Sequence, residues 1–121
     1  MSIDYSDMAF PKPVFKKKRK KSKPPILDTE RNICFLCAHL KGDIRRKRTE
    51  AHHIIFGGGR RKISEEEGLK VWLCLLHHRF GPEAVHNNQE MRKLLCNLAQ
   101  KRFEETHTRE EWMQLVEENY I

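Results

Sequence analysis

The sequence lacks any long apolar run. Of its 121 residues 38% are apolar, and no stretch approaches the roughly 20 consecutive apolar residues that a membrane-spanning helix requires. Its N-terminus is polar and then rich in proline and lysine, so it also lacks the apolar segment of a secretory signal peptide. We therefore expect a soluble protein located in the cytoplasm.

The small apolar fraction also limits the core. A chain of 121 residues is expected to form one domain, and its thin core would be helped by a bound metal. Cysteine is scarce too, with four residues in all. The spacing Cys34-x-x-Cys37, followed later by Cys74-x-x-His77, matches paired zinc ligands better than a disulfide framework. Reduced thiols agree with a cytoplasmic location.

Positive charge is concentrated at the N-terminus. Residues 1–24 hold eight Lys and Arg against two Asp, which gives +6 of the formal net charge of +7. We expect residues 1–25 to form a disordered basic arm and residues 26–121 to form the domain. The arm could be a solubilising tail, an address signal or a grip on phosphates, and we adopt the last because basic clusters also flank the histidines. The candidate nucleic-acid-binding residues are Lys16, Lys17, Lys18, Arg19, Lys20 and Lys21 in the arm, and Arg60, Arg61 and Lys62 in the domain.

The middle of the chain predicts a β-hairpin with a long loop. Residues 49–56 form a strand rich in β-branched and aromatic side chains, and residues 69–73 form a second strand of alternating apolar positions. Between them, the glycines 57–59 are interpreted as a flexible loop, since a phosphate-binding loop would need a following Lys-Ser/Thr and a helix. Residues 63–68 are expected to be a polar link.

The second half predicts helices. Residues 75–80 begin a short helix that Gly81-Pro82 ends. A longer helix starts after Asn87 or Asn88 and runs to about residue 105. Thr108 and Glu111 form a capping box that opens a last helix. These elements predict the α+β fold class.

Eight candidate metal ligands lie between residues 34 and 86. They are Cys34, Cys37, His52, His53, Cys74, His77, His78 and His86. Two pairs, Cys34 with Cys37 and Cys74 with His77, are typical of a closed structural zinc site, and their soft thiolates disfavour magnesium or calcium. Cys96 is predicted to be a small core residue.

The remaining histidines predict a second site. Adjacent residues on a strand point to opposite faces, so His52 and His53 cannot easily bind the same ion. One of them can bind a metal while the other acts as a general base on water, a role that suits imidazole near neutral pH. His78 follows the zinc ligand His77 and can reach a second ion, with His86 a further candidate ligand.

These motifs resemble those of the HNH endonucleases, the ββα-metal superfamily. The resemblance rests on Glu50-Ala51-His52-His53-Ile54 before a glycine loop, on residues 73–78 with the sequence Leu-Cys-Leu-Leu-His-His, and on the preceding Cys34-x-x-Cys37. It covers residues 33–88, and the wider pattern is similar to small phage-encoded HNH proteins, including Ref-type recombination nucleases. It implies a small zinc-stabilised, treble-clef-like core with a β-hairpin, a short helix and two C-terminal helices.

The resemblance also implies roles for individual residues. His53 is the general base, and His52, His78 and His86 are the ligands of a catalytic divalent metal, either Mg, Mn or Zn. Cys34, Cys37, Cys74 and His77 hold a structural Zn. The family's asparagine, which orients the base, is missing from its usual position, and Ser64 is the candidate substitute.

The implied function is hydrolysis of phosphodiester bonds in DNA with little sequence preference. A phage or prophage protein acting in DNA recombination or processing would work in the cytoplasm of the bacterial host. The alternative is a zinc-stabilised module that binds nucleic acid without catalysis. A zinc-dependent interaction adaptor is a third interpretation, which the basic clusters disfavour.

Overall fold

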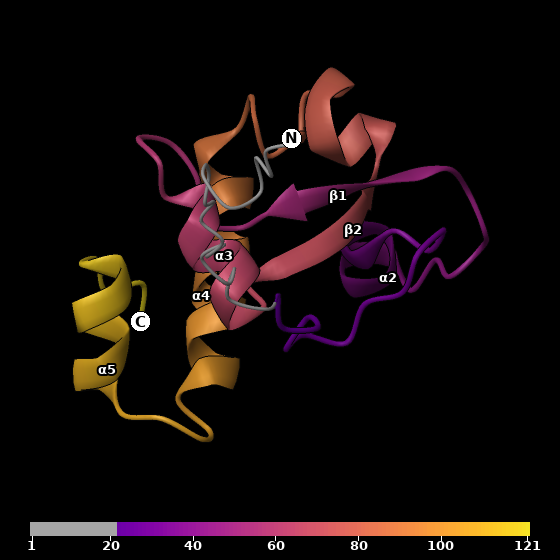
Figure 1. Ribbon diagram of the computed structural model, residues 1–121. Helices are drawn as coiled ribbons and strands as arrows, with labels where there is room; N and C mark the ends of the chain where they lie inside the picture. The colour runs from indigo at the N-terminus through magenta and orange to yellow at the C-terminus, as the bar shows by residue number, and fades with distance from the viewer. Residues whose placement is uncertain (1–21) are drawn as a thin grey trace, which may run out of the picture.

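A computed structural model describes residues 22–121, which form an α+β fold around a two-stranded antiparallel sheet (Figure 1). The candidate nucleic-acid-binding residues 16–21 of the predicted arm lie outside the described residues. Of the predicted arm, residues 22–25 are described, and Ser22 and Lys23 both hydrogen bond to Glu65. The elements in chain order are α2 (Phe35–Lys41), β1 (Thr49–His53), α3 (Arg61–Glu67), β2 (Lys70–Cys74), η1 (Leu76–Phe80), α4 (Gln89–Phe103) and α5 (Arg109–Val116).

The predicted hairpin is present, with β1 shorter than expected. Its register pairs Thr49 with Cys74 at one end and His53 with Lys70 at the other. The strand ends at His53 instead of residue 56 because the backbone N–H of Ile55 donates to the Ser64 hydroxyl and not to β2. The glycines 57–59 follow in left-handed conformations, as a sharp glycine loop requires.

The segment predicted to be a polar link is a helix, so that prediction was wrong. Helix α3 spans Arg61–Glu67, and Ser64 is its fully buried residue. The helix ends at Gly68 with φ +73°, and a Cβ there would lie 2.3 Å from the carbonyl oxygen of Pro24. Because α3 buries so little apolar surface, its sequence carries almost no amphipathic signal.

Two short elements hold the paired cysteines and histidines of the chain. Cys34 is the N-cap of α2, where its sulfur accepts a hydrogen bond from the N–H of Cys37. The predicted short helix after β2 is η1, a single π-helical turn, and it stops at Gly81. Both elements pack against the end of β2 where Cys74 lies.

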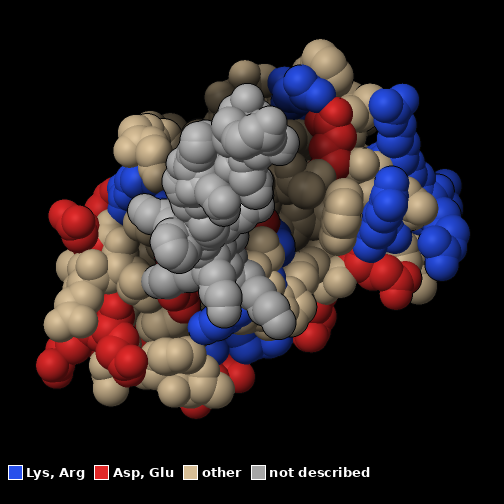
Figure 2. Space-filling model, viewed as in Figure 1, with Lys and Arg blue, Asp and Glu red and all other residues tan. Residues whose placement is uncertain are grey.

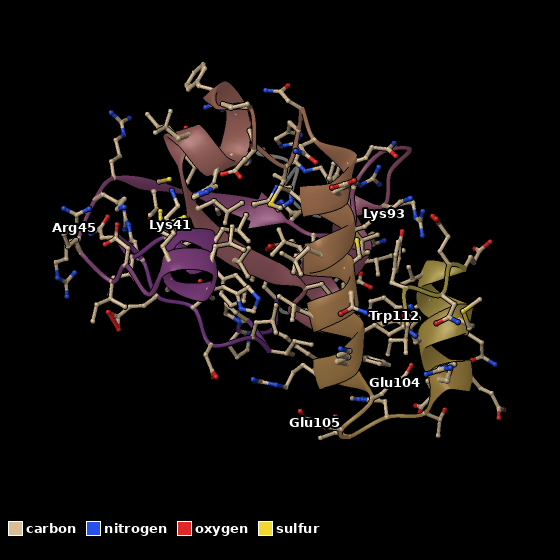
Figure 3. The ribbon with its side chains drawn as sticks, turned by 180° about the vertical axis from the view of Figure 1, so that it is seen from behind. Lys41, Arg45, Lys93, Glu104, Glu105 and Trp112 are labelled. Carbon is tan, nitrogen blue, oxygen red and sulfur yellow. The ribbon has the colours of Figure 1, made fainter. Side chains whose placement is uncertain are left out.

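The two C-terminal helices form the scaffold. Asn88 caps α4 and the Thr108–Glu111 capping box opens α5, both as predicted. Helix α4 crosses behind the hairpin in Figure 1, with α5 beside it on the side away from α2; Figure 3 gives the reverse view. The rings of Phe103 and Trp112 meet edge to face at 5.5 Å and join the two helices to the core. Among the described residues, no helix is both long and apolar enough to cross a membrane.

Candidate metal centres

The first candidate centre brings together all four predicted zinc ligands. Nδ1 of His77 lies 3.5 Å from the sulfur of Cys34 and 3.4 Å from the sulfurs of Cys37 and Cys74. The sulfurs of Cys37 and Cys74 are 3.9 Å apart, far beyond a disulfide bond. A tetrahedral zinc with ordinary bond lengths places its ligand atoms about 3.6–3.8 Å apart. The cluster therefore fits a structural metal such as zinc.

Burial makes this cluster dependent on a counter-charge. All four residues are buried. Burial raises the pKa of the Cys34 thiol to about 12, and it lowers the pKa of the His77 imidazole. At Cys74 burial also opposes ionisation, but hydrogen bonds from the His77 N–H and the neighbouring sulfurs leave its pKa lowered. A bound cation would offset the cost of holding thiolates in this interior.

The second candidate centre consists of His52, His78 and His86. Their ligand nitrogens all lie within 4.8 Å of one another. Nε2 of His78 is 3.2 Å from Nε2 of His86, and the His52 ring centroid lies 5.1 Å and 5.2 Å from the other two. The three imidazoles come from β1, from η1 and from the loop before α4. They form the donor set that the sequence assigned to a divalent metal.

His52 carries the observation that points most directly to a ligand. Its side chain is buried, and its Nε2 is the one buried side-chain nitrogen or oxygen among the described residues that has no hydrogen-bond partner. Burial, with a further contribution from the neighbouring His78 and His86, lowers its pKa to about 3. A neutral imidazole with an unpartnered buried nitrogen is costly unless that nitrogen binds something, and a metal ion fits.

Glu50 orients the second ligand, a role that the sequence left unassigned. The N–H at Nδ1 of His78 donates to a Glu50 oxygen at 2.8 Å, which leaves the Nε2 lone pair facing His86. The Arg79 guanidinium donates hydrogen bonds to the same carboxylate through two nitrogens, at 3.0 Å and 2.5 Å. These contacts, that of Arg79 first, lower the pKa of Glu50 to about 2. A carboxylate behind a histidine is the usual support of a metal ligand.

His53 lies on the other face of β1, as the strand geometry predicts. Its Nε2 is 3.1 Å from a Glu65 oxygen, and Lys70 and Ser22 hold the same carboxylate. Among the described residues Nδ1 of His53 has no hydrogen-bond partner. Glu65 therefore orients this imidazole and leaves its second nitrogen available. Glu65 lies in α3, where the sequence predicted a polar link. Its contact with His53 was therefore not predicted.

Ser64, the candidate substitute for the orienting asparagine, lies elsewhere. It is fully buried, and its hydroxyl both donates to the Ile55 carbonyl at 2.8 Å and accepts from the Ile55 N–H at 2.9 Å. These two bonds fix the start of the glycine loop. The contact with His53 is made by the next residue along α3.

An open cleft of about 310 Å³ joins the histidines. His52, His53, His78 and His86 all line it, and His53 is outside the group of three whose nitrogens converge. Arg61 and Arg79 supply positive charge at its wall, which Phe56 and Gly57 also line. The cleft therefore combines a metal-ligand set, a further histidine and cationic side chains in a space open to solvent.

The three basic residues after the glycine loop have different surroundings. Arg61 lines the cleft. Arg60 instead reaches the C-terminal region, where it bonds to Glu118 and to the carbonyl oxygen of Val116. Lys62 is largely exposed and lies 4.0 Å from Glu66. Of the three, Arg61 is the one that lies at the cleft.

Comparison of the chain with protein-family models, curated proteins and solved structures gives no match.

Proposed function

We propose that this chain is a metal-dependent DNA endonuclease of the HNH, or ββα-metal, type. The observation that carries the proposal is the arrangement of the cleft, in which three convergent imidazoles include a buried, unpartnered nitrogen and a fourth imidazole faces the same space from the opposite side of β1. The hairpin, the short turn with paired histidines and the Cys₃His cluster agree with a treble-clef-like core.

The residues divide the chemistry between them. His52, His78 and His86 would hold the divalent ion, which when bound supplies positive charge against the charge that develops on the phosphate and the leaving oxygen. His53, held at Nε2 by Glu65, accepts a proton at Nδ1 from the attacking water. Arg61 at the cleft wall binds a phosphate oxygen.

The site favours cutting with little sequence preference. Its charged groups are suited to phosphates, which are the same at every position of DNA. A role in phage-associated recombination or DNA processing is part of the same proposal and rests on the sequence resemblance alone.

A plasmid-nicking assay tests this function. The full chain, loaded with zinc, is incubated with supercoiled plasmid and added Mg²⁺ or Mn²⁺. His53→Ala is expected to lower the nicking rate by about 10²–10⁴-fold without changing metal content. His39→Ala, which changes a histidine stacked on Phe35 in α2, is the matched control and keeps full activity.

Two outcomes contradict the proposal. Nicking by His53→Ala at the wild-type rate would remove the assigned base. Retarded migration of DNA without any nicking by the wild-type chain would favour the alternative, a zinc-stabilised nucleic-acid-binding module.

A further inference from the structure

A second basic surface lies away from the histidine cleft. We define the basic loop as the five cationic residues at the end of α2 and in the segment that leads to β1, namely Lys41, Arg45, Arg46, Lys47 and Arg48. In Figure 2 Lys and Arg gather over this loop at the right edge of the molecule. In Figure 3, Arg45 projects away from the body of the fold.

The loop has a defined shape although it contains no helix or strand. Asp43 accepts hydrogen bonds from the backbone and guanidinium of Arg45 and from Lys47. The ammonium of Lys47 also lies 3.3 Å from the sulfur of Cys37, and its backbone N–H donates to the Asn32 carbonyl. The loop is therefore anchored to the Cys₃His cluster, so its outer cations are presented without a large ordering cost on binding.

The outer cations are accessible and only partly neutralised. The side chains of Arg45 and Arg46 are 85% and 71% exposed. Arg46 has a long contact of 3.9 Å with Glu30, and among the described residues Lys41 and Arg48 form no ion pair. Two carboxylates, Asp43 and Glu30, thus face five cations. The excess positive charge favours a polyanion.

The hairpin register fixes how far the loop lies from the cleft. Arg48 directly precedes Thr49 at one end of β1, while His53 is at the other end. At about 3.3 Å per residue, the five residue steps from Arg48 to His53 separate the two by about 17 Å. This distance corresponds to about five base pairs of duplex DNA at 3.4 Å each.

We propose that the basic loop binds the backbone phosphates of duplex DNA about five base pairs from the phosphate held in the histidine cleft. The inference rests on the proposed function for its choice of partner. The loop positions the duplex along β1, and its contacts carry no sequence information because they are made to phosphates.

The test removes two cations of the loop that make no contact with Asp43. Arg46→Ala/Arg48→Ala leaves the Asp43 bonds intact. Lys93→Ala/Lys101→Ala, on the exposed surface of α4, removes the same charge elsewhere and is the matched control. Both pairs are made in the full chain with His53→Ala, so that the DNA stays intact. Binding to a long fluorescent duplex is measured by anisotropy over a range of salt concentrations.

Loss of two phosphate contacts should make the slope of log affinity against log salt shallower by about 1.8, and should weaken binding at moderate salt on the order of tenfold. The control pair should leave the slope unchanged. Equal effects of the two pairs would overturn the proposal, as would competition by polyglutamate as strong as that by DNA, which would indicate an acidic protein partner.

The DNA-binding test of the basic loop and the nicking test of the proposed function can fail independently of each other. Plasmid nicking by the chain without the His53 change decides the nuclease assignment. Selective loss of binding without any nicking would retain the DNA-binding loop and reject the catalytic cleft. Plasmid nicking by the chain without the His53 change, together with equal DNA binding by the two double variants, would retain the catalytic cleft and reject the DNA-binding loop.

Discussion

Nε2 of His78 and Nε2 of His86 face each other at 3.2 Å, although eight residues separate them along the chain. Two backbone contacts make this approach possible, because the N–H of Val85 donates to the His77 carbonyl and the amide of Asn87 donates to the Arg79 carbonyl. The loop therefore folds back onto η1. With Nδ1 of His78 already donating to Glu50, the Nε2 lone pair is free to bind a cation.

The first prediction is that the two centres bind metal independently. Wild-type protein should hold two ions per chain, and His86→Ala should keep the ion of the Cys₃His cluster and lose the other. Cys74→Ser should lose the structural ion and much of the folding free energy, because metal binding stabilises only the folded chain. Metal analysis after dialysis and thermal unfolding measure both effects.

Cys96→Ala is the control for these variants. Cys96 is buried in α4 outside both clusters, so its truncation should cost on the order of 1 kcal/mol and leave both ions bound. Loss of metal in this variant would contradict the assignment of ligands.

The second prediction concerns Glu50. Glu50→Ala removes the carboxylate that orients His78 and should weaken metal binding at the histidine centre by about 10–100-fold. Titration calorimetry with Mn²⁺ on zinc-loaded protein gives the affinity. Glu110→Ala, on the exposed side of α5, should leave it unchanged. Unaltered affinity in Glu50→Ala would mean that His78 does not depend on its carboxylate partner.

The third prediction concerns Glu65 as a positioning residue. Glu65→Gln weakens the hold on Nε2 of His53 and should lower kcat for nicking about 10–100-fold with KM unchanged, since the carboxylate orients the base and does not contact DNA. Glu67→Gln removes a carboxylate two residues away, whose contact is with Lys23, and should retain activity. A change in KM alone would assign Glu65 to substrate binding instead.

The fourth prediction is a pH dependence of stability set by His52. Its pKa is lowered to about 3 in the folded chain, so between that value and the ordinary imidazole pKa of 6.5 the unfolded chain binds more protons. The contribution of neutral His52 to the free energy of unfolding is therefore fully present above pH 6.5 and is lost as the pH falls, at up to about 1.4 kcal/mol per pH unit.

His52→Leu removes this titration while keeping an apolar side chain in place. Without added divalent ions, the stability of His52→Leu relative to wild type should rise between pH 7 and 5 by about 2 kcal/mol, as measured by urea denaturation. Parallel pH profiles for the two proteins would show that His52 is not protonated on unfolding.

Much of the fold was predictable because its signals are local. The capping box of Thr108 and Glu111 and the alternation in β2 depend on neighbouring residues, and both are present in the structure. Helix α3 was not predictable in this way, since its sequence reads as polar and only Ser64 and the contacts with residues 22–26 place it.

At the candidate centres, too, the ligand pairs set by local spacing were predictable and the contacts set by tertiary packing were not. The Cys-x-x-Cys and Cys-x-x-His spacings each predict that the two ligands of the pair lie close together, because each pair spans one turn. The neighbours of His53 and His78 could not be predicted, since Glu65 and Glu50 reach them across the hairpin loop and across the sheet to η1. Pairs that depend on tertiary packing leave no periodic trace in a single sequence.

The adjacency of His77 and His78 in η1 has an evolutionary consequence. One peptide bond links a ligand of the buried cluster to a ligand of the open one, so insertion or deletion of a single residue there would displace one imidazole from its cluster. The two centres are therefore expected to be inherited together, and a descendant that lost its cysteines would need a new anchor before the arrangement of its histidine cleft could persist.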